Sequence, residues 1–377
     1  MTPPDTRPAT RSTSRERAKG IGRRIGLVIG VVTVITAAAA IVAIKPWATN
    51  PFHPTKTVRY LGVYEPDAPH TYERIDQFAQ AIGRQPNLVS YYSSWRERFQ
   101  AGFATSASKH GAVTVVQIDP KNISLATIAA GQYDTYLRHY ASEVKAFRGQ
   151  VILSFGHEMN GNWYSWANLH SSAGDFVAAW RHLVRVFRAV GARNATWLWT
   201  VNVIDPNNSI PDPAPWWPGG SYVNWVGIDG YYYLSSQSFA QVFGPTIIAV
   251  LKLTHDPIII AETGVAPDAG QQAKVDDLFA GIRSYGLAGF MWFDQNTQGR
   301  NWRISDPGAF AAFRHNAKEF VRPAAPTPTR LSTACRLLGP VVAGFDHWGQ
   351  PYAKPYSDFP ERQDNPYVTW HARSGSV

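Results

Sequence analysis

Two glutamates in this chain stand directly after apolar runs that are typical of buried strands. Glu158 follows the run 151–155, and Glu262 follows the run 258–261. The two residues are 104 positions apart, so only the fold could bring them together. Cleavage of a glycosidic bond needs one protonated carboxyl group for the departing oxygen and one ionised carboxylate facing the anomeric carbon. These two glutamates are the sequence's candidates for that chemistry.

The neighbours of each glutamate predict which role it takes. Trp163 and Trp166 follow Glu158 closely, and aromatic rings that exclude water disfavour the charged form of a carboxyl group, so Glu158 suits the acid. Glu262 is expected to accept a hydrogen bond from Tyr231, and such a donor keeps a carboxylate charged, so Glu262 suits the nucleophile. A retaining arrangement would place the two carboxyl groups about 5–5.5 Å apart.

The elements that must position these residues alternate between strands and helices from about residue 57 onward. Several strand candidates are continuous apolar runs, which is typical of parallel strands covered on both faces. Eight strands over about 265 residues, most of them followed by helical patterns, predict a (β/α)8 TIM barrel, with a doubly wound sheet as the structural alternative. The predicted strands are 58–63, 88–92, 112–118, 151–155, 196–201, 225–230, 258–261 and 288–293. The predicted helices are 72–84, 96–109, 125–147, 175–190, 239–253, 272–285 and 307–320, with a Pro-rich loop at 205–221.

Active sites of such barrels lie where the strands end and the βα loops begin. The residues at those points join the two glutamates as candidates for substrate binding. These candidates are His157, Trp163, Trp166, Trp199, Asn202, Asp229, Tyr231 and Trp292. Sugar rings stack their C–H faces on aromatic rings, so a cleft rich in tryptophan favours a polysaccharide as substrate.

The run Gly-His-Glu-Met-Asn-Gly at 156–161, with the tryptophans behind it, resembles the acid/base motif of glycoside hydrolase family 26. The segments 197–202, 226–231 and 259–264 and Trp292 resemble the family in the same order, so the resemblance covers roughly 58–320. It implies a retaining (β/α)8 enzyme, most often a β-mannanase, with Glu158 as acid/base and Glu262 as nucleophile. It further implies that His157 and Asp229 shape the subsite beside the cut and that Trp292 is the sugar platform.

Charge and composition exclude several other classes of protein. The chain has 377 residues and a net charge of +9, yet residues 46–321 carry 22 basic and 21 acidic side chains. The large domain is therefore nearly neutral, and no nucleic-acid partner is expected. A single cysteine excludes a disulfide framework or a cysteine-based zinc site, and Gly161 stands where a zinc helix would need its second histidine. We expect no metal and no organic cofactor.

The N-terminal region has the pattern of a membrane anchor. Residues 25–44 are uncharged and long enough to cross a bilayer of about 30 Å, and basic residues precede them. This predicts a cytoplasmic disordered basic segment (1–24), a transmembrane signal anchor (25–44), a linker (45–56) and a catalytic barrel (57–321) outside the cytoplasm. A cleaved signal peptide, which would give a secreted protein, is the alternative. A Pro-rich linker (322–330) and a tail (331–377) without an assigned role would follow.

Together these patterns predict a membrane-bound, extracytoplasmic, retaining endo-β-glycanase. An endo-β-1,4-mannanase is favoured by the resemblance, and mixed-linkage β-glucan, β-1,3-xylan or a capsule polymer of the producing cell are alternative substrates. A surface glycan-binding protein without turnover is the alternative from another functional class, although both carboxyl groups are present. The sequence does not assign an oligomeric state.

Overall fold

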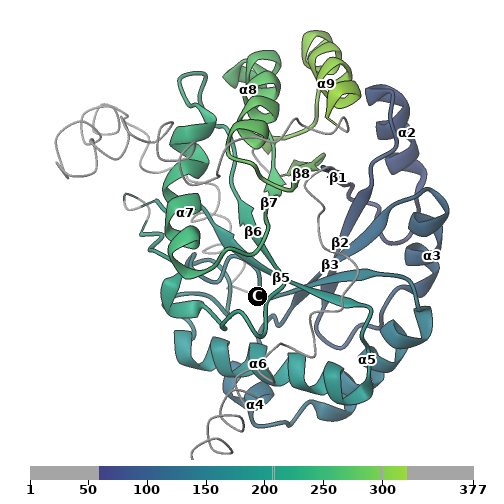
Figure 1. Cartoon of the computed structure of the whole chain (residues 1–377), viewed down its shortest axis with the longest axis vertical. Helices are drawn as coiled ribbons and strands as arrows, with labels where there is room; N and C mark the ends of the chain where they lie inside the picture. Colours follow the sequence, from purple (N-terminus) through teal and green to yellow (C-terminus); the bar gives the residue numbers. More distant parts are fainter. Residues whose placement is uncertain (1–58, 206, 208, 298–299, 321–377) are drawn as a thin grey trace, which may run out of the picture. The chain divides into compact units, whose positions relative to one another are not determined.

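The computed structural model describes residues 59–320, apart from positions 206, 208, 298 and 299. Within that part, eight parallel strands close into a barrel in which each strand pairs with the next along the chain and β8 pairs with β1 (Figure 1). The fold is therefore the predicted α/β TIM barrel. The strands are β1 (Tyr60–Tyr64), β2 (Leu88–Ser94), β3 (Val113–Asp119), β4 (Val151–Phe155), β5 (Ala195–Asn202), β6 (Trp225–Asp229), β7 (Ile258–Thr263) and β8 (Gly289–Phe293).

The strands form because their side chains are apolar on both faces of the sheet. Every residue of β4, β5, β6 and β7 is buried. One set of side chains fills the barrel interior and a larger set packs between the strands and the surrounding helices. The interior set draws at least one residue from every strand: Tyr60, Leu88, Val115, Ile152, Leu198, Trp225, Ile259, Ala261 and Met291. The interior is thus a packed core that supports the mouth of the barrel.

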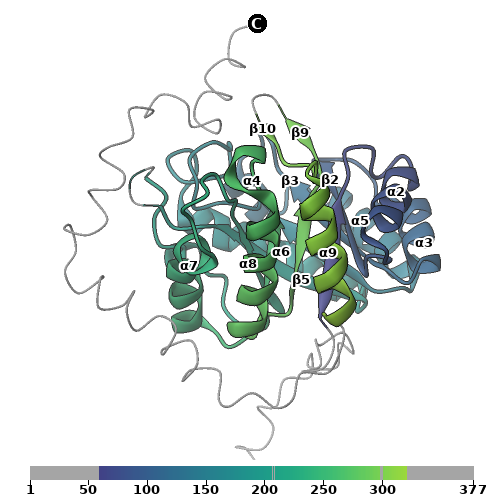
Figure 2. The ribbon, with the colours of Figure 1, turned by 90° about the horizontal axis from the view of Figure 1, so that it is seen from above.

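Helices cover the outside of the barrel, and α8 lies beside α9 (Figure 2). Several begin at a side-chain cap: Ser172 accepts a hydrogen bond from the backbone of Asp175, and Ser238 forms a reciprocal capping box with Gln241. The helices are α2 (Glu73–Ile82), α3 (Ala101–Lys109), α4 (Leu125–Ala129), α5 (Asp134–Phe147), α6 (Ala173–Val190), α7 (Phe239–Leu253), α8 (Gln271–Ser284) and α9 (Pro307–Glu319). Two single-turn helices, η2 (Ala214–Trp216) and η3 (Pro267–Ala269), and a short hairpin of β9 (Asn296–Thr297) and β10 (Arg300–Asn301) complete these elements.

The structure differs from the sequence-based prediction at two helices. The single helix expected over 125–147 is two helices, because Gly131 adopts φ 81° between α4 and α5 and ends the first one. The helix expected to begin at residue 96 begins at Ala101, and a loop occupies the positions before it. The Pro-rich segment 205–221 is a loop containing η2, as predicted.

The predicted N-terminal and C-terminal segments lie outside the described residues. These are 1–24, 25–44, 45–56, 322–330 and 331–377, so the anchor, both linkers, the tail and the two domain boundaries stay predictions. Among the residues that the structure describes, no helix has the length and apolarity that crossing a membrane requires.

Closure of the barrel predicts a strong effect of substitution at Gly289. Gly289 pairs with Tyr60 across the β1–β8 seam, and a Cβ atom at this position would overlap the backbone carbonyl of Tyr60. We expect Gly289→Ala to lower the free energy of unfolding by about 3 kcal/mol or more, at the upper end of overpacking effects, measured by denaturant unfolding. Gly220→Ala is the matched control, because a Cβ at Gly220 would meet nothing within 4 Å. Equal stability of the two variants would contradict this account of the seam.

Candidate active site

Glu158 lies just beyond β4 in a strained backbone conformation that its partners hold. Its φ is +53°, a left-handed value that is costly for a residue with a side chain. Its backbone N–H donates to the carbonyl of Thr200 at 3.0 Å. Asn202 Nδ2 donates to Oε1 at 2.5 Å and Trp163 Nε1 donates to Oε2 at 2.8 Å, so each carboxyl oxygen is held by one donor. The orientation of this group is therefore fixed before any substrate binds.

The surroundings of Glu158 raise its pKa to about 7. Burial is the largest cause, since the residue is only 2% exposed and its charged form loses hydration. The nearby charge of Glu262 raises the pKa further, whereas His157 and the two hydrogen-bond donors lower it. A carboxyl group with such a pKa is substantially protonated near neutral pH, as a general acid must be.

Glu262 lies in β7, and its carboxyl group has a different set of partners. The phenol of Tyr92 donates to Oε2 and the phenol of Tyr231 donates to Oε1. Burial raises the pKa of Glu262, while His157 and both phenols lower it, and the net direction is upward. Because a carboxylate only accepts hydrogen bonds, the two donors favour its ionised form and hold both of its oxygens.

His157 places a positive charge between the acidic groups. Its Nδ1 lies 3.0 Å from Asp119 Oδ1, and its Nε2 lies 3.1 Å from the phenol oxygen of Tyr164. Burial alone would lower its pKa, but the charges of Asp119 and both catalytic candidates outweigh burial and raise the pKa to about 9. The ring is therefore an imidazolium at neutral pH, and both of its nitrogens donate.

Asp229 is a third carboxyl group at the same place. It ends β6 and is paired with Glu262 in the strand ladder, after a register shift that follows Ile228. The side chain is fully buried, and neither oxygen has a hydrogen-bond partner among the described residues. Burial and the charges of Glu262 and Glu158 raise its pKa well above the ordinary value. Asp229 is thus an available polar group beside the nucleophile candidate, and its predicted contact with substrate stays a prediction.

The predicted tryptophans and Asn202 lie around the site in different ways. Trp163 and Asn202 bind Glu158 directly, so they orient the acid. Trp166, Trp199 and Trp292 are at most 1% exposed, and Trp292 Nε1 donates to the backbone of Trp302 at 3.1 Å. The structure places these three rings in the packing around the site. Trp292 also lines the same narrow hollow as Glu262, and its role as sugar platform stays a prediction.

Sequence reasoning did not single out Tyr92, Asp119 and Tyr164 as site residues. Tyr92 lies near the end of β2 and Asp119 is the last residue of β3, so both satisfy the strand-end rule that found the other candidates. Tyr164 lies in the same loop as Glu158 and stacks on Trp166, with ring centroids 4.3 Å apart. The strand-end rule applied to every strand, rather than to those beside conspicuous motifs, would have found the first two.

A pair of less buried aromatic rings lies near Glu262. Tyr64 of β1 and Phe293 of β8 stack with their ring centroids 4.8 Å apart, and both are only partly buried. Together with Tyr92 and Glu262 they line a narrow hollow at the mouth of the barrel. Among the described residues, no group of three or more histidine, cysteine, aspartate or glutamate side chains could hold a metal ion.

A closed eight-stranded barrel with two buried glutamates, one after β4 and one within β7, is the arrangement expected of barrel enzymes that act on glycosidic bonds. A model described as Glycosyl hydrolase family 26 matches residues 98–279. The chain contains a glycoside hydrolase family 26 domain, and the enzymes of this family retain the configuration of the anomeric carbon.

Similarity to known proteins agrees with this assignment. The chain is 32% identical over 257 residues to Endoglucanase H of Acetivibrio thermocellus, an alignment that covers 64% of this chain and 28% of that protein. An endo-beta-1,4-mannanase double mutant of Cellulomonas fimi has a TM-score of 0.56 and 16% identity, over 71% of this chain and 72% of that one. A Bacillus subtilis mannanase has a TM-score of 0.53 and 14% identity, over 69% and 86%. At these identities the two structures establish the barrel fold.

The contact between Asp119 and His157 predicts a shift in the pH dependence of hydrolysis. Asp119→Asn removes a charge that favours the imidazolium, so the pKa of His157 falls. With less positive charge nearby, the pKa of Glu158 rises, because His157 lowers it. At Glu262 the weaker charge of His157 and the lost charge of Asp119 act in opposite directions. We expect the basic limb of the pH profile of kcat/KM, which reports the acid Glu158, to move to higher pH.

The matched control is Asp175→Asn, which changes a half-buried aspartate in the first turn of α6, away from the site. Its profile should overlay that of the parent protein. A basic limb that keeps the parent's position in Asp119→Asn would show that Asp119 does not set the charge on His157.

Proposed function

We propose that this chain is a retaining endo-β-glycanase that cleaves internal bonds of a β-linked polysaccharide. The observation that carries the proposal is the unequal treatment of two buried carboxyl groups. Burial and the charge of Glu262 favour the protonated form of Glu158 and raise its pKa to about 7 despite its indole and amide donors. At Glu262 two phenol donors and His157 oppose burial and favour the ionised form. Two carboxyl groups in different states are what the double-displacement reaction needs.

In the first step, Glu262 attacks the anomeric carbon and Glu158 gives its proton to the departing glycosidic oxygen. The carbon–oxygen bond to the leaving sugar breaks as the bond to the Glu262 carboxylate forms. Tyr92 and Tyr231 keep the attacking carboxylate in place through both of its oxygens.

In the second step, Glu158 is ionised and removes a proton from a water molecule that attacks the same carbon. The ester bond to Glu262 breaks, and the product has the configuration of the substrate. The charge of Glu262 disappears when it forms the ester, which lowers the pKa of Glu158, because that charge contributes to raising it. The acid of the first step is therefore converted into the base of the second.

Four polymers are candidates for the substrate. We expect β-1,4-mannan first, because solved structures with the same barrel are described as mannanases. Mixed-linkage β-glucan is the second candidate, because a relative at 32% identity is named an endoglucanase. That relative is much longer than the matched segment, so its name covers parts that this chain does not share. β-1,3-Xylan and a capsule polymer of the producing cell require the same chemistry.

The placement of the barrel outside the cytoplasm is also part of the proposal. It rests on the uncharged segment 25–44 and the basic residues before it. The chain would be held in the membrane through this segment, or secreted if the segment is cleaved, and a polysaccharide outside the cytoplasm would be within its reach.

Added azide, acting in variants that lack one of the two carboxyl groups, tests the roles assigned to Glu158 and Glu262. Glu158→Ala should lower polymer hydrolysis by about 10²–10⁴-fold, the range for loss of an acid/base group, and Glu262→Ala should abolish it. With an activated aryl β-glycoside, azide replaces the nucleophile in Glu262→Ala by a single displacement and gives the α-glycosyl azide. In Glu158→Ala, azide attacks the covalent intermediate and gives the β-glycosyl azide.

The configuration of the azide product, read by NMR, therefore identifies each residue. If Glu262→Ala gave the β-glycosyl azide and Glu158→Ala the α-glycosyl azide, the two roles would be reversed. Hydrolysis at the parent rate in Glu262→Ala would refute the mechanism. The matched control is Glu73→Ala, which changes an exposed glutamate at the start of α2 and should leave activity unchanged.

A panel of polymers tests the choice of substrate. Reducing-end yields on linear mannan, mixed-linkage glucan, β-1,3-xylan and capsule polysaccharide are measured at equal mass concentration. We expect the highest yield on mannan. A higher yield on glucan would replace mannan as the substrate and leave the two-glutamate mechanism intact, whereas binding without any yield would favour a glycan-binding protein.

A further inference from the structure

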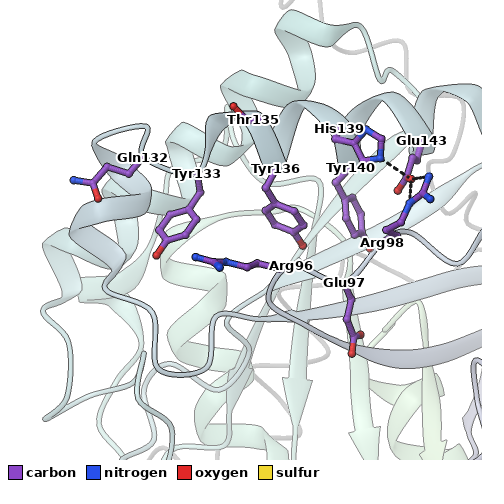
Figure 3. A pocket seen from close by; sticks show the side chains of 10 residues that line it. All are labelled: Arg96, Glu97, Arg98, Gln132, Tyr133, Thr135, Tyr136, His139, Tyr140 and Glu143. Carbon is purple, nitrogen blue, oxygen red and sulfur yellow. Dashed lines mark hydrogen bonds and ion pairs between the residues drawn. The ribbon is translucent and has the colours of Figure 1, made fainter.

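A cavity of about 470 Å³ lies on the outside of the barrel, between the loop that follows β2 and the helix α5 (Figure 3). This volume falls within the range of small-ligand pockets, about 300–1,000 Å³. The cavity shares no lining residue with the hollow beside Glu262, so it is a separate feature of the domain.

One wall of the cavity is a row of tyrosines on α5. Tyr133 precedes the first turn of the helix, and Tyr136 and Tyr140 follow at spacings of three and four, which places the three rings on one face. Figure 3 shows the rings side by side along the helix, opposite Arg96. Tyr133 and Tyr136 are only partly buried, and the guanidinium of Arg96 lies 5.5 Å from the centre of the Tyr133 ring. Aromatic faces and a planar hydrogen-bond donor thus meet in one concave surface.

The opposite wall is fixed to the helix before any ligand binds. Glu143 of α5 accepts hydrogen bonds from Arg98 Nε at 2.5 Å and from the backbone N–H of Phe99 at 3.0 Å. Trp95 packs its ring against Tyr133 and Tyr136, with centroids 5.5 and 5.0 Å away. A pocket held open in this way loses little conformational freedom when it binds a ligand.

The charges of the lining favour a neutral ligand. Arg96 and Arg98 are balanced by Glu97 and Glu143, and the remaining polar groups include an amide, a hydroxyl and an imidazole. Balanced charge gives no attraction for a phosphate or a nucleic acid. Ring faces with amide, guanidinium and carboxylate groups at their edges match the C–H faces and hydroxyl groups of a neutral sugar chain.

We propose that this cavity, lined by Arg96, Tyr133, Tyr136 and Tyr140, is a second carbohydrate-binding site that holds the β-linked polysaccharide outside the catalytic cleft. The inference rests on the proposed function, because it takes the same polymer as ligand. A polymer bound at both places is held at a high effective concentration near the cleft, whereas a short oligosaccharide occupies one place at a time. The site would therefore favour action on long chains.

Affinity electrophoresis with the full chain tests this site separately from catalysis. Each variant is made in the Glu262→Ala background, so that the polymer in the gel is not degraded, and migration is compared in gels with and without soluble mannan or mixed-linkage glucan. We expect Tyr133→Ala to weaken retardation by about three- to tenfold, the value of one aromatic contact. Tyr133→Phe keeps the ring and should bind like the parent.

The matched control is Tyr222→Ala. Tyr222 is also half-buried and has the guanidinium of Arg181 5.4 Å from its ring centre, but it does not line the cavity. Retardation of this control should equal that of the parent, and circular dichroism of every variant verifies folding. Unchanged retardation in folded Tyr133→Ala would overturn the proposal.

A second measurement separates this inference from the proposed function. With Glu262 restored, Tyr133→Ala should keep kcat/KM on a short aryl oligosaccharide within about twofold and lose activity on the long polymer. An equal loss of activity on both substrates would show that Tyr133 contributes to the catalytic cleft, and would contradict a second site. The parent could also hydrolyse none of the polymers and still show retardation that depends on Tyr133. This result would refute the proposed function but support the second binding site.

Discussion

The burial of acidic groups around one imidazolium is the constraint on which this site depends. Glu158, Glu262 and Asp229 lie within the reach of each other's charge, and burial raises the pKa of all three. Buried carboxylates without compensation are strongly disfavoured. Here His157 supplies positive charge, and its own protonated state depends on Asp119. The proton distribution among these groups is therefore a property of the cluster, and a change in any member alters the others.

The barrel makes this cluster possible because it brings strand ends together that are far apart in sequence. Asp229 lies opposite Glu262 only after a register shift between β6 and β7, and a second shift separates Ile260 from Thr263 between β7 and β8. Local irregularities of this kind redirect side chains next to active sites. The barrel interior next to these irregular ends is filled by side chains from every strand and gives them a rigid support.

The sequence predicted the barrel well because buried parallel strands are continuous apolar runs, and the bounds of β4 agree residue for residue. It placed Glu158 and Glu262 at strand ends by the same reasoning. The split of α4 from α5 was missed, because a single glycine such as Gly131 is compatible with a continuous helix until its φ is known.

The tryptophans were harder to interpret, since residue type does not reveal which rings the packing covers. Trp163 and Trp292 have the same side chain, yet one holds the carboxyl of Glu158 and the other is buried against the backbone of Trp302. Of the two hydrogen-bond donors to Glu262, the sequence predicted Tyr231 and missed Tyr92. Tyr231 follows a neighbouring strand, whereas Tyr92 comes from β2 and reaches Glu262 across the closed barrel. Such a pairing depends on barrel closure, which no local pattern encodes.

The two proposed sites differ in the way each is held, and the difference follows from what each must do. In the cleft, every donor to Glu158 and Glu262 is buried or nearly so, because the proton states that catalysis needs exist only where water is excluded. In the outer cavity the rings of Tyr133 and Tyr136 are partly open and the charges balance, because a neutral polymer needs contact area and an easy route of release. Weak contacts of this second kind increase the residence of a long chain without slowing turnover, since each contact can dissociate while the other remains bound.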